Sequence, residues 1–463
     1  MKEEYTREEI SMILDTYMYT NYMEANDGET LKTIIENMPA NIDVTGDYKE
    51  EYAILSDAVQ NPQIGNLRIR CQSRKMGYNE GTNAVTFISE DGKDAYVVFR
   101  GTHDGEWLDN GDGLVLEETT QQREAVRYYD EVVETLKPDK KTNLTITGHS
   151  KGGNKAQYVT MDSQYGGLIN RCYSIDGQGH SDAAINKWKT RYSESEYNAR
   201  VEKIYAVNGQ NDFVSVLGNS IILAGHTAYI ATPADKTDFA AYHDITHMFA
   251  HQTVDENGTT DYEYSSERNG YVLKRGELGD YVSVLSSEVM EMPETFREGS
   301  TTTLMQVAEA VGGDRKIGLN GEYMTLSDLK KFELTGVPVI AYSLLATPQG
   351  AGFLDTLINK DGFSLPISDF NTVDVDYEAL DMSAANLKEA CNKINALLAL
   401  TEATGLSIPL YVDGIGYKRA MIENSIIKLK VIEMKLSKLA AIQADIASLY
   451  RKFDNESEKY FKL

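Results

Sequence analysis

The chain has 463 residues, of which 41% are hydrophobic and 25% charged, and its formal net charge is −26. This length and composition predict a globular protein of two or three domains. The strong negative charge argues against sequence-independent binding to nucleic acid and against electrostatic docking on anionic membranes.

Cysteine usage and the first residues indicate the compartment. Cys71, Cys172 and Cys391 are few and far apart, which argues against a disulfide framework and against a paired-cysteine metal site. The first twenty residues are acidic and polar where a signal peptide has an apolar centre. No apolar run reaches the roughly 18 residues of a membrane-spanning helix. We expect synthesis in a reducing cytosol, and any export would proceed without a cleaved N-terminal signal.

The first 210 residues alternate between helix-like and strand-like patterns. Residues 1 to about 90 read as helices followed by short strands, with Ile10, Ile13, Leu14 and Tyr17 at helical spacing. The predicted strands are 84–89, 94–99, 143–148, 170–177 and 201–209, and the predicted helices between them are 119–136 and 151–163. Because alternating strands and helices form βαβ units, we expect a largely parallel sheet with helices on its faces.

The pattern changes after about residue 280. Segments 279–296 and 301–313 read as helices, and segment 325–336 opens with a capping signal and ends at a glycine. Segment 346–372 is rich in proline and glycine, and it predicts a domain junction.

The last ninety residues read as two long helices. Apolar residues from Ile422 to Phe453 recur every three or four positions, which is typical of a coiled-coil-like seam. The first of the two helices, over 382–405, is shorter, and glycines and a proline separate it from the second. A helical hairpin with an apolar stripe is the simplest interpretation, and the stripe packs either on a partner or on its own chain.

A serine lies between two glycines where a predicted strand meets a predicted helix. Gly148-His149-Ser150-Lys151-Gly152 fits the G-x-S-x-G pattern of a nucleophile elbow. Side chains two residues before and after the serine would collide with the neighbouring strand and helix, and glycine removes that collision. The helix that follows directs N–H groups and its positive dipole end at developing negative charge. The alternative is a glycine-rich turn with an idle serine.

A nucleophilic serine needs an oxyanion hole and an acid. The backbone N–H of Lys151 follows the nucleophile directly, and Thr102 follows an earlier strand, so we expect these two residues to hold the oxyanion. Asp212 follows a later strand and is the expected acid. Asp176 also ends a strand and is the rival, but it comes only one strand after the nucleophile.

The base should come late in the chain. His243, His247 and His251 cluster near residue 247, and we favour His243 as the base, with His247 as the alternative. The three lie at i, i+4 and i+8, so a zinc site on a helix is a rival interpretation. However, Asp244 stands where a zinc protease motif has glutamate, and no close ligand cluster completes a site.

The segments "VVFRGT", "EWLDN", "TITGHSKGGN", "YSIDGQG" and "GQNDFVSVLG" together resemble the class 3 lipases, and more closely a bacterial lipase-like branch with a G-H-S-K-G-G-N elbow. The resemblance covers residues 1 to 290. It implies an α/β-hydrolase fold in which Ser150 is the nucleophile, Asp212 the acid, His243 the base, and Thr102 and Lys151 the oxyanion hole. It also implies that Trp107 packs beneath the oxyanion loop. The lysine after the nucleophile departs from many lipases.

The C-terminal hairpin is similar to the targeting modules of type VII secretion substrates. "YRKFD", Tyr450 to Asp454, fits their Y-x-x-x-D/E signal. An N-terminal lipase-like domain followed by a C-terminal targeting hairpin resembles the reversed domain order of some toxin lipases of this secretion system. That resemblance implies a phospholipase acting on competitor membranes, small helical secretion partners or chaperones, and an immunity protein in the producing cell.

These observations predict a lipase-like α/β-hydrolase domain over 1–290, a helical extension and linker over 291–365, and an all-helical targeting hairpin over 366–463. The expected activity is serine-dependent cleavage of carboxylic esters in lipids or phospholipids, with no metal and no organic cofactor. The alternatives are an esterase for small soluble esters and a non-catalytic scaffold that acts through its C-terminal helices.

Overall fold

The computed structural model describes residues 4–20, 25–79, 81–102, 106–138, 141–234, 240–254 and 260–291, with short stretches and single positions between 297 and 395. Its contacts divide the chain into two units, 1–336 with 348–356 and 337–347 with 357–463. The first unit contains the sheet and its helices. The predicted junction at 346–372, the paired C-terminal helices and the Tyr450–Asp454 signal lie outside the described residues, and so do most of the helices predicted after residue 296.

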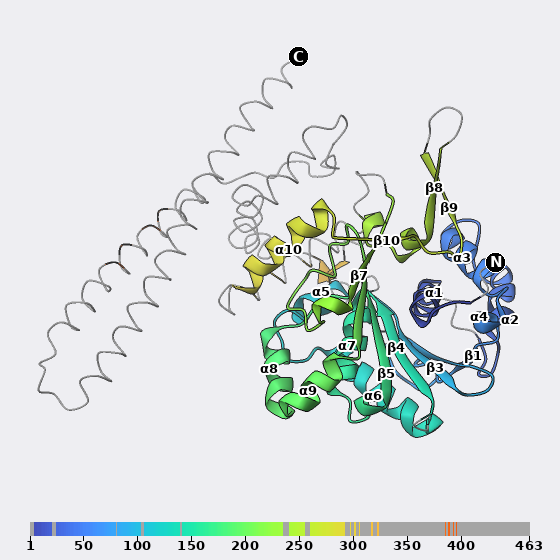
Figure 1. Cartoon of the computed structure of the whole chain (residues 1–463), viewed down its shortest axis with the longest axis horizontal. Helices are drawn as coiled ribbons and strands as arrows, with labels where there is room; N and C mark the ends of the chain where they lie inside the picture. Colours follow the sequence, from blue (N-terminus) through green and yellow to red (C-terminus); the bar gives the residue numbers. More distant parts are fainter. Residues whose placement is uncertain are drawn as a thin grey trace, which may run out of the picture. The chain divides into compact units, whose positions relative to one another are not determined.

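An eight-stranded sheet with the order β1-β2-β3-β4-β5-β6-β7-β10 organises the first unit (Figure 1). Strands β3 to β7 are parallel, whereas β1, β2 and β10 pair antiparallel at the two edges. The strands are β1 Arg68–Arg70, β2 Ala84–Ile88, β3 Asp94–Phe99, β4 Asn143–His149, β5 Ile169–Ile175, β6 Ile204–Gly209, β7 Thr227–Ile230 and β10 Tyr271–Val272. The predicted parallel core is therefore confirmed, and this is the α/β-hydrolase arrangement.

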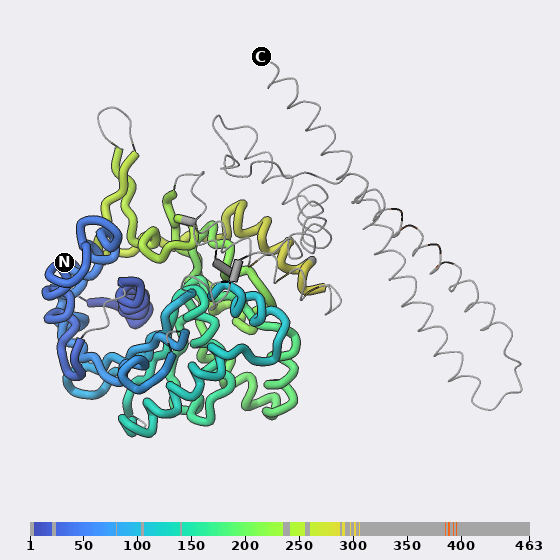
Figure 2. The backbone as a smooth tube through the Cα atoms, turned by 180° about the vertical axis from the view of Figure 1, so that it is seen from behind, coloured from blue at the N-terminus to red at the C-terminus, as the bar shows by residue number. Residues whose placement is uncertain are grey.

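Helices cover both faces of the sheet. The α-helices are α1 Arg7–Tyr19, α2 Leu31–Asn37, α3 Lys49–Ala58, α4 Pro62–Gly65, α5 Trp107–Asp112, α6 Thr120–Leu136, α7 Lys151–Asp162, α8 Asp182–Arg191, α9 Glu194–Val201 and α10 Glu277–Met290. Short 3₁₀ turns are η1 Met38–Ala40, η2 Gly166–Leu168, η3 Ala224–His226, η4 Ala240–Tyr242 and η5 Ile245–Phe249. Seen from behind, α1 lies against the strands among the other N-terminal helices (Figure 2). Within the part of the chain that the structure describes, no helix combines the length and apolarity that crossing a bilayer requires.

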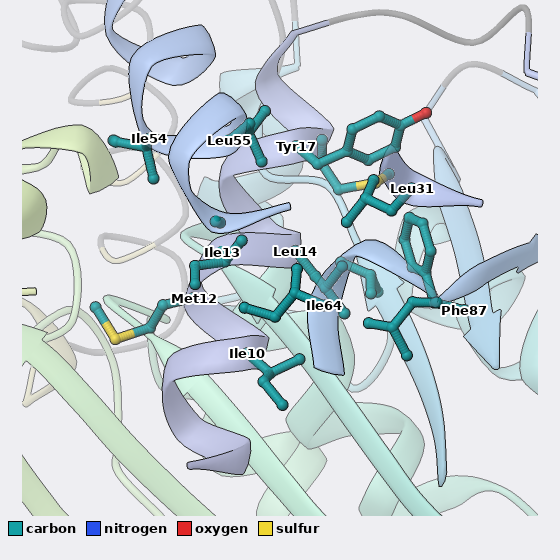
Figure 3. Packing of buried hydrophobic residues seen from close by; sticks show 14 of the residues in the cluster. Ile10, Met12, Ile13, Leu14, Tyr17, Leu31, Ile54, Leu55, Ile64 and Phe87 are labelled. Atoms are coloured by element: carbon teal, nitrogen blue, oxygen red, sulfur yellow. The ribbon is translucent and has the colours of Figure 1, made fainter. Parts of the chain in front are cut away.

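Helix α1 packs on one face of the sheet because its apolar residues recur at helical spacing. Thr6 caps it in a reciprocal capping box with Glu9. Ile10, Ile13 and Leu14 are buried against the neighbouring helices and the sheet (Figure 3). Burial of side chains of this size stabilises the fold by about 1.5–3 kcal/mol each. The last residue of α1, Tyr19, reaches the carboxyl end of β4.

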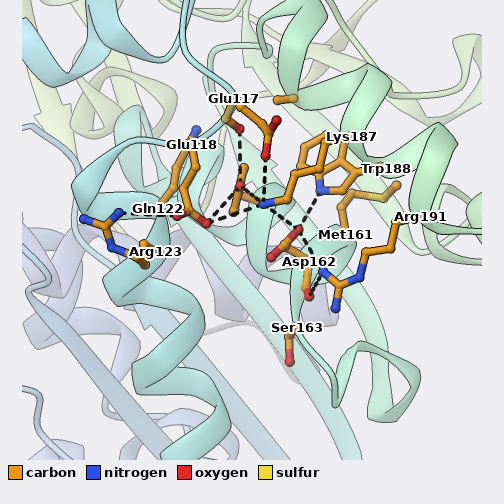
Figure 4. A network of polar contacts seen from close by, with 12 residues as sticks. Glu117, Glu118, Gln122, Arg123, Met161, Asp162, Ser163, Lys187, Trp188 and Arg191 are labelled. Carbon is orange, nitrogen blue, oxygen red and sulfur yellow. Dashed lines mark hydrogen bonds and ion pairs between the residues drawn. The ribbon is translucent and has the colours of Figure 1, made fainter.

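The opposite face is covered by α6 and α7. Residues of β3 alternate between the two cores, with Tyr96 and Val98 on the α1 side and Val97 and Phe99 on the α7 side. A polar network then ties helix α8 to the far end of α7 (Figure 4). Asp162 accepts a hydrogen bond from Trp188 Nε1 at 3.1 Å and lies 3.1 Å from the ammonium of Lys187. Helix α7 is therefore anchored at its C-terminal end.

Two hairpins were not expected from the sequence. Strands β8 Ala250–Val254 and β9 Thr260–Tyr264 pair antiparallel. Strands β11 Lys316–Ile317 and β12 Glu322–Tyr323 also pair antiparallel, between the segments 301–313 and 325–336 for which helices are predicted.

Candidate active site

Ser150 lies at the sharp turn between β4 and α7. Its φ of 59° and ψ of −126° fall in a region that non-glycine residues rarely adopt, and such backbone strain costs about 1–3 kcal/mol and concentrates at functional positions. A Cβ on Gly148 would collide with the backbone of Gly152, and a Cβ on Gly152 would collide with the carbonyl of Phe99. Both glycines are therefore required by close backbone approach, as the elbow pattern predicts.

The structure brings His243 and Asp212 to this serine. His243 Nε2 lies 2.8 Å from Ser150 Oγ, and His243 Nδ1 lies 2.6 Å from Asp212 Oδ1. An ionised carboxylate only accepts, so the imidazole carries its hydrogen on Nδ1 and its Nε2 accepts from the serine hydroxyl. This is the geometry of a nucleophile, a base and an orienting acid.

Each partner is held by its own local structure. Asp212 follows β6, and its second oxygen accepts the backbone N–H of Ser215 at 2.6 Å. Its residue exposure is 1%, so the carboxylate is fixed and shielded from water. His243 lies in the turn between η4 and η5, with its side chain 12% exposed. The imidazole is thus the most accessible of the three side chains.

Asp176, the rival acid, does not contact His243 as a hydrogen-bond partner among the described residues. Its Oδ1 accepts the backbone N–H of Gly209 at 2.7 Å, and its φ is 46°. Burial first, and the charge of Asp212 second, raise the pKa of Asp176 well above its usual value. Asp176 is therefore a neutral carboxylic acid next to the Asp212 carboxylate.

The two predicted oxyanion residues flank the nucleophile. Lys151 is the first residue of α7, where backbone N–H groups have no intrahelical partner. Thr102 follows β3, and its hydroxyl accepts a hydrogen bond from Asn110 Nδ2 at 2.8 Å. A Cβ on the adjacent Gly101 would lie 3.1 Å from Ser150 Cβ. The loop that carries Thr102 therefore runs directly beside the serine.

The side chain of Lys151 is buried in an ion pair. Its ammonium lies 2.7 Å from Asp109 Oδ2, and its side chain is 1% exposed. Burial raises the pKa of Asp109, but the charge and hydrogen bond of Lys151 outweigh this effect, so the pKa lies below its usual value. The lysine that departs from the lipase pattern thus fastens α5 to α7.

Trp107, expected beneath the oxyanion loop, opens α5. It packs against a small apolar cluster, with Leu114, Met290, Met305 and Leu217.

The three histidines of the sequence cluster do not lie on one helix. His243 lies between η4 and η5, His247 in η5 and His251 in β8, so the helical arrangement that the zinc interpretation assumed is not formed. His247 Nδ1 lies 2.8 Å from the carbonyl of Pro233, and His251 Nε2 lies 2.8 Å from the carbonyl of Glu267. Among the described residues, the group with metal-like spacing is instead His149, Asp176 and His243.

Two side chains near the serine, those of Tyr19 and His149, have no signal in the sequence pattern. Tyr19 Oη lies 2.6 Å from His149 Nδ1, and the His149 ring lies 4.8 Å from the His243 ring. Burial first, and His243 second, lower the pKa of His149 well below its usual value. A second, neutral imidazole therefore packs against the ring of His243.

One family model and several solved structures are similar to parts of this chain. The family model described as Mbeg1-like matches residues 58–217, a span that includes Ser150 and Asp212 but ends before His243. The solved structures include a triacylglycerol lipase from Penicillium expansum at 14% identity (TM-score 0.25, covering 36% of this chain and 70% of that one). A Rhizomucor miehei lipase propeptide complex also has 14% identity (TM-score 0.28, covering 53% and 80%). Lip2 lipase from Yarrowia lipolytica has 16% identity (TM-score 0.24, covering 36% and 67%). No curated protein sequence matches significantly.

Proposed function

We propose that this protein is a serine hydrolase that cleaves carboxylic esters of lipids. The observation that carries the proposal is the continuous chain from Ser150 Oγ through His243 to Asp212, with contacts of 2.8 and 2.6 Å. The strained serine between a strand and a helix supports it, because that turn exposes the hydroxyl beside helix N–H groups.

The reaction follows from this geometry. Ser150 Oγ attacks the ester carbonyl carbon while its proton passes to His243 Nε2, and the carbonyl electrons move to the oxygen. The backbone of Lys151 and the Thr102 loop stabilise that oxyanion. The leaving alcohol takes the proton from His243, and an acyl-enzyme remains. Water then repeats the sequence and releases the carboxylic acid.

The test is release of fatty acid from phospholipid vesicles and of acid from a short soluble acyl ester. Wild type, Ser150→Ala and the exposed control Ser195→Ala in α9 are compared, and each is treated with a fluorophosphonate that labels active serines. We expect activity and labelling in wild type and in Ser195→Ala, and neither in Ser150→Ala. Activity on the soluble ester alone indicates a small-ester esterase. If neither substrate is hydrolysed and no serine is labelled, the proposal is contradicted and the non-catalytic scaffold is favoured.

We further propose that the natural substrate is a phospholipid and that the protein is a type VII effector made in a bacterial cytoplasm. Small helical partners would bind its C-terminal hairpin, and an immunity protein would protect the producer. The support is the Tyr450–Asp454 pattern and the apolar seam before it, both sequence observations. Export of full-length protein is compared with that of Tyr450→Ala, and equal secretion of the two contradicts this route.

A further inference from the structure

The imidazole of His243 is carried by a turn rather than by a helix or a strand. His243 lies between η4 and η5, and its ring nitrogens contact Asp212 at 2.6 Å and Ser150 at 2.8 Å. Both hydrogen bonds lie in the plane of the ring, so they restrain only weakly a tilt of the ring about the line that joins its nitrogens. Side chains on loops are held less precisely than those on helices or strands. The orientation of this base therefore depends on what packs against its ring.

Two other rings pack against His243. The ring of His149 lies 4.8 Å from it, centroid to centroid, at an interplanar angle of 31°, and the ring of Phe213 lies 5.4 Å away at 48°. Both separations are contact distances for aromatic rings. His149 directly precedes Ser150, and Phe213 directly follows Asp212. The two chain segments that supply the nucleophile and the acid thus also supply the ring contacts of the base.

A tyrosine holds the His149 ring in turn. Tyr19 ends α1, its Oη lies 2.6 Å from His149 Nδ1, and the two rings pack edge to face with centroids 5.3 Å apart. The other ring nitrogen, Nε2, is directed toward the backbone carbonyl of His243, at a geometry weaker than a standard hydrogen bond. A carbonyl only accepts, so the ring hydrogen of His149 lies on Nε2, and Nδ1 accepts from the tyrosine hydroxyl. The hydroxyl of Tyr19 therefore fixes both the tautomer and the rotation of His149.

The burial of His149 suits a neighbour of a base that becomes charged. The residue is 3% exposed, and burial first, followed by His243, lowers its pKa well below the usual value. During the reaction His243 takes the proton of Ser150 and becomes positively charged. A second charged imidazole in contact would repel it, whereas an uncharged ring does not. His149 can therefore pack against the base in both of its protonation states.

We propose that His149 and Phe213 are positioning residues, whose rings hold the imidazole of His243 in its catalytic orientation. Tyr19 is a third positioning residue, which acts through His149. None of the three makes or breaks a bond to the substrate. This inference rests on the proposed hydrolase function and deepens it, because it accounts for how a base carried by a turn stays aimed at Ser150.

The first test compares wild type with Tyr19→Phe, His149→Leu and Phe213→Leu on an activated short acyl ester. Tyr19→Phe removes only a hydroxyl, and the two leucine variants each replace a ring contact by an aliphatic side chain. We expect kcat to fall about tenfold in each, since a reacting group misplaced by about 1 Å costs up to about 10²-fold, with KM changed less than about threefold. Tyr17→Phe is the matched control on α1, because the ring of Tyr17 packs against Phe87, and its kcat should equal that of wild type.

The second test repeats the three substitutions in a His243→Ala background. A triad variant keeps a residual rate above that of water, which comes from the oxyanion hole and from binding. A residue that acts only through the His243 ring has nothing to position in this background, so we expect no further loss of kcat. A structural role, such as support of the elbow, would instead lower the residual rate by the same factor as in wild type. Non-additivity therefore separates positioning from structure.

The outcomes separate this inference from the function beneath it. If wild type neither hydrolyses esters nor reacts with fluorophosphonate, both are overturned. If activity depends on Ser150 but the three variants keep wild-type kcat, or lose as much in the His243→Ala background as in wild type, only the positioning role is overturned. A loss that disappears together with His243 supports it. Circular dichroism identifies any variant that fails to fold, and the remaining variants then decide.

Discussion

The ammonium group of Lys151 lies 2.7 Å from Asp109 Oδ2 and donates to the backbone carbonyl of the same residue at 2.8 Å. Lys151 therefore contributes in two ways. Its backbone N–H lies at the start of α7, and its side chain holds α5 in place. Asn110 on α5 in turn donates to Thr102. The two halves of the proposed oxyanion hole are thus linked through one buried ion pair.

Breaking that pair should be costly because it leaves a buried charge without its partner. We expect Lys151→Met to lower the free energy of unfolding by about 3–5 kcal/mol and to lower kcat by displacing Thr102. Urea unfolding and ester hydrolysis measure the two effects. Adding Asp109→Asn should recover part of the loss, since the stranded carboxylate is removed. Strictly additive losses in the double variant would show that the pair is not coupled.

The elbow glycines should tolerate no side chain. In Gly152→Ala the new methyl group meets the carbonyl of Phe99, and we expect a loss of about 3 kcal/mol or more, seen as a lower Tm and little soluble protein. Gly167→Ala is the matched control, because nothing lies within 4 Å of its Cβ. Its stability should stay within about 0.5 kcal/mol of wild type. Equal losses in both variants would refute the steric argument.

The acid should matter through the orientation of the base. Asp212→Asn keeps the shape but replaces the acceptor that holds His243 Nδ1–H, so we expect kcat to fall about 10⁴-fold. His247→Gln should retain activity, because His247 contacts the carbonyl of Pro233 rather than Ser150. Steady-state kinetics on a soluble ester give kcat for both variants. A larger loss in the His247 variant would reverse the assignment of the base.

Because Lys155 on α7 is buried, the free energy of unfolding should change with pH in the alkaline range. Burial lowers the pKa of Lys155 to about 8, whereas the unfolded chain binds that proton up to about 10.4. Between these values the unfolded state holds more protons, so the unfolding free energy rises with pH by at most about 1.4 kcal/mol per unit.

This dependence is measured by urea unfolding of wild type and Lys155→Met at pH 7, 8, 9 and 10. Wild type should gain stability relative to the variant above pH 8. Lys189→Met, at an exposed position of α8, should give a difference that does not change with pH. A flat difference for Lys155→Met as well would mean that the Lys155 pKa is not lowered.

The sequence supported the parallel sheet and the elbow because both depend on local patterns. The strand periodicity and the glycines around Ser150 are local, and Asp212 and His243 follow from chain order. Tyr19 had no such signal. It lies two residues after Tyr17, whose ring packs edge-on against Phe87 in the core, and both residues fit the same amphipathic helix. Only the packing of α1 against β4 separates a core tyrosine from one at the site.

Chain order disfavours Asp176 as the acid, but its position next to Asp212 depends on how β5 and β6 align. The ion pair of Lys151 likewise depends on α5, which enters the site from a segment with no helical periodicity of note. Contacts of this kind join elements that are remote in sequence, so periodicity cannot reveal them.

Helix α1 is synthesised well before β4, the strand on which it packs. Its hydrogen bonds to β4 join Tyr19 to His149 and Asp15 to Thr147, across 130 and 132 positions. At a translation rate of roughly 5–20 residues per second, the ribosome takes on the order of ten seconds to complete the partner strand. Throughout that interval the apolar side of α1 has no sheet to cover it. The nascent chain therefore exposes an amphipathic helix to chaperones before the sheet that covers it has been made.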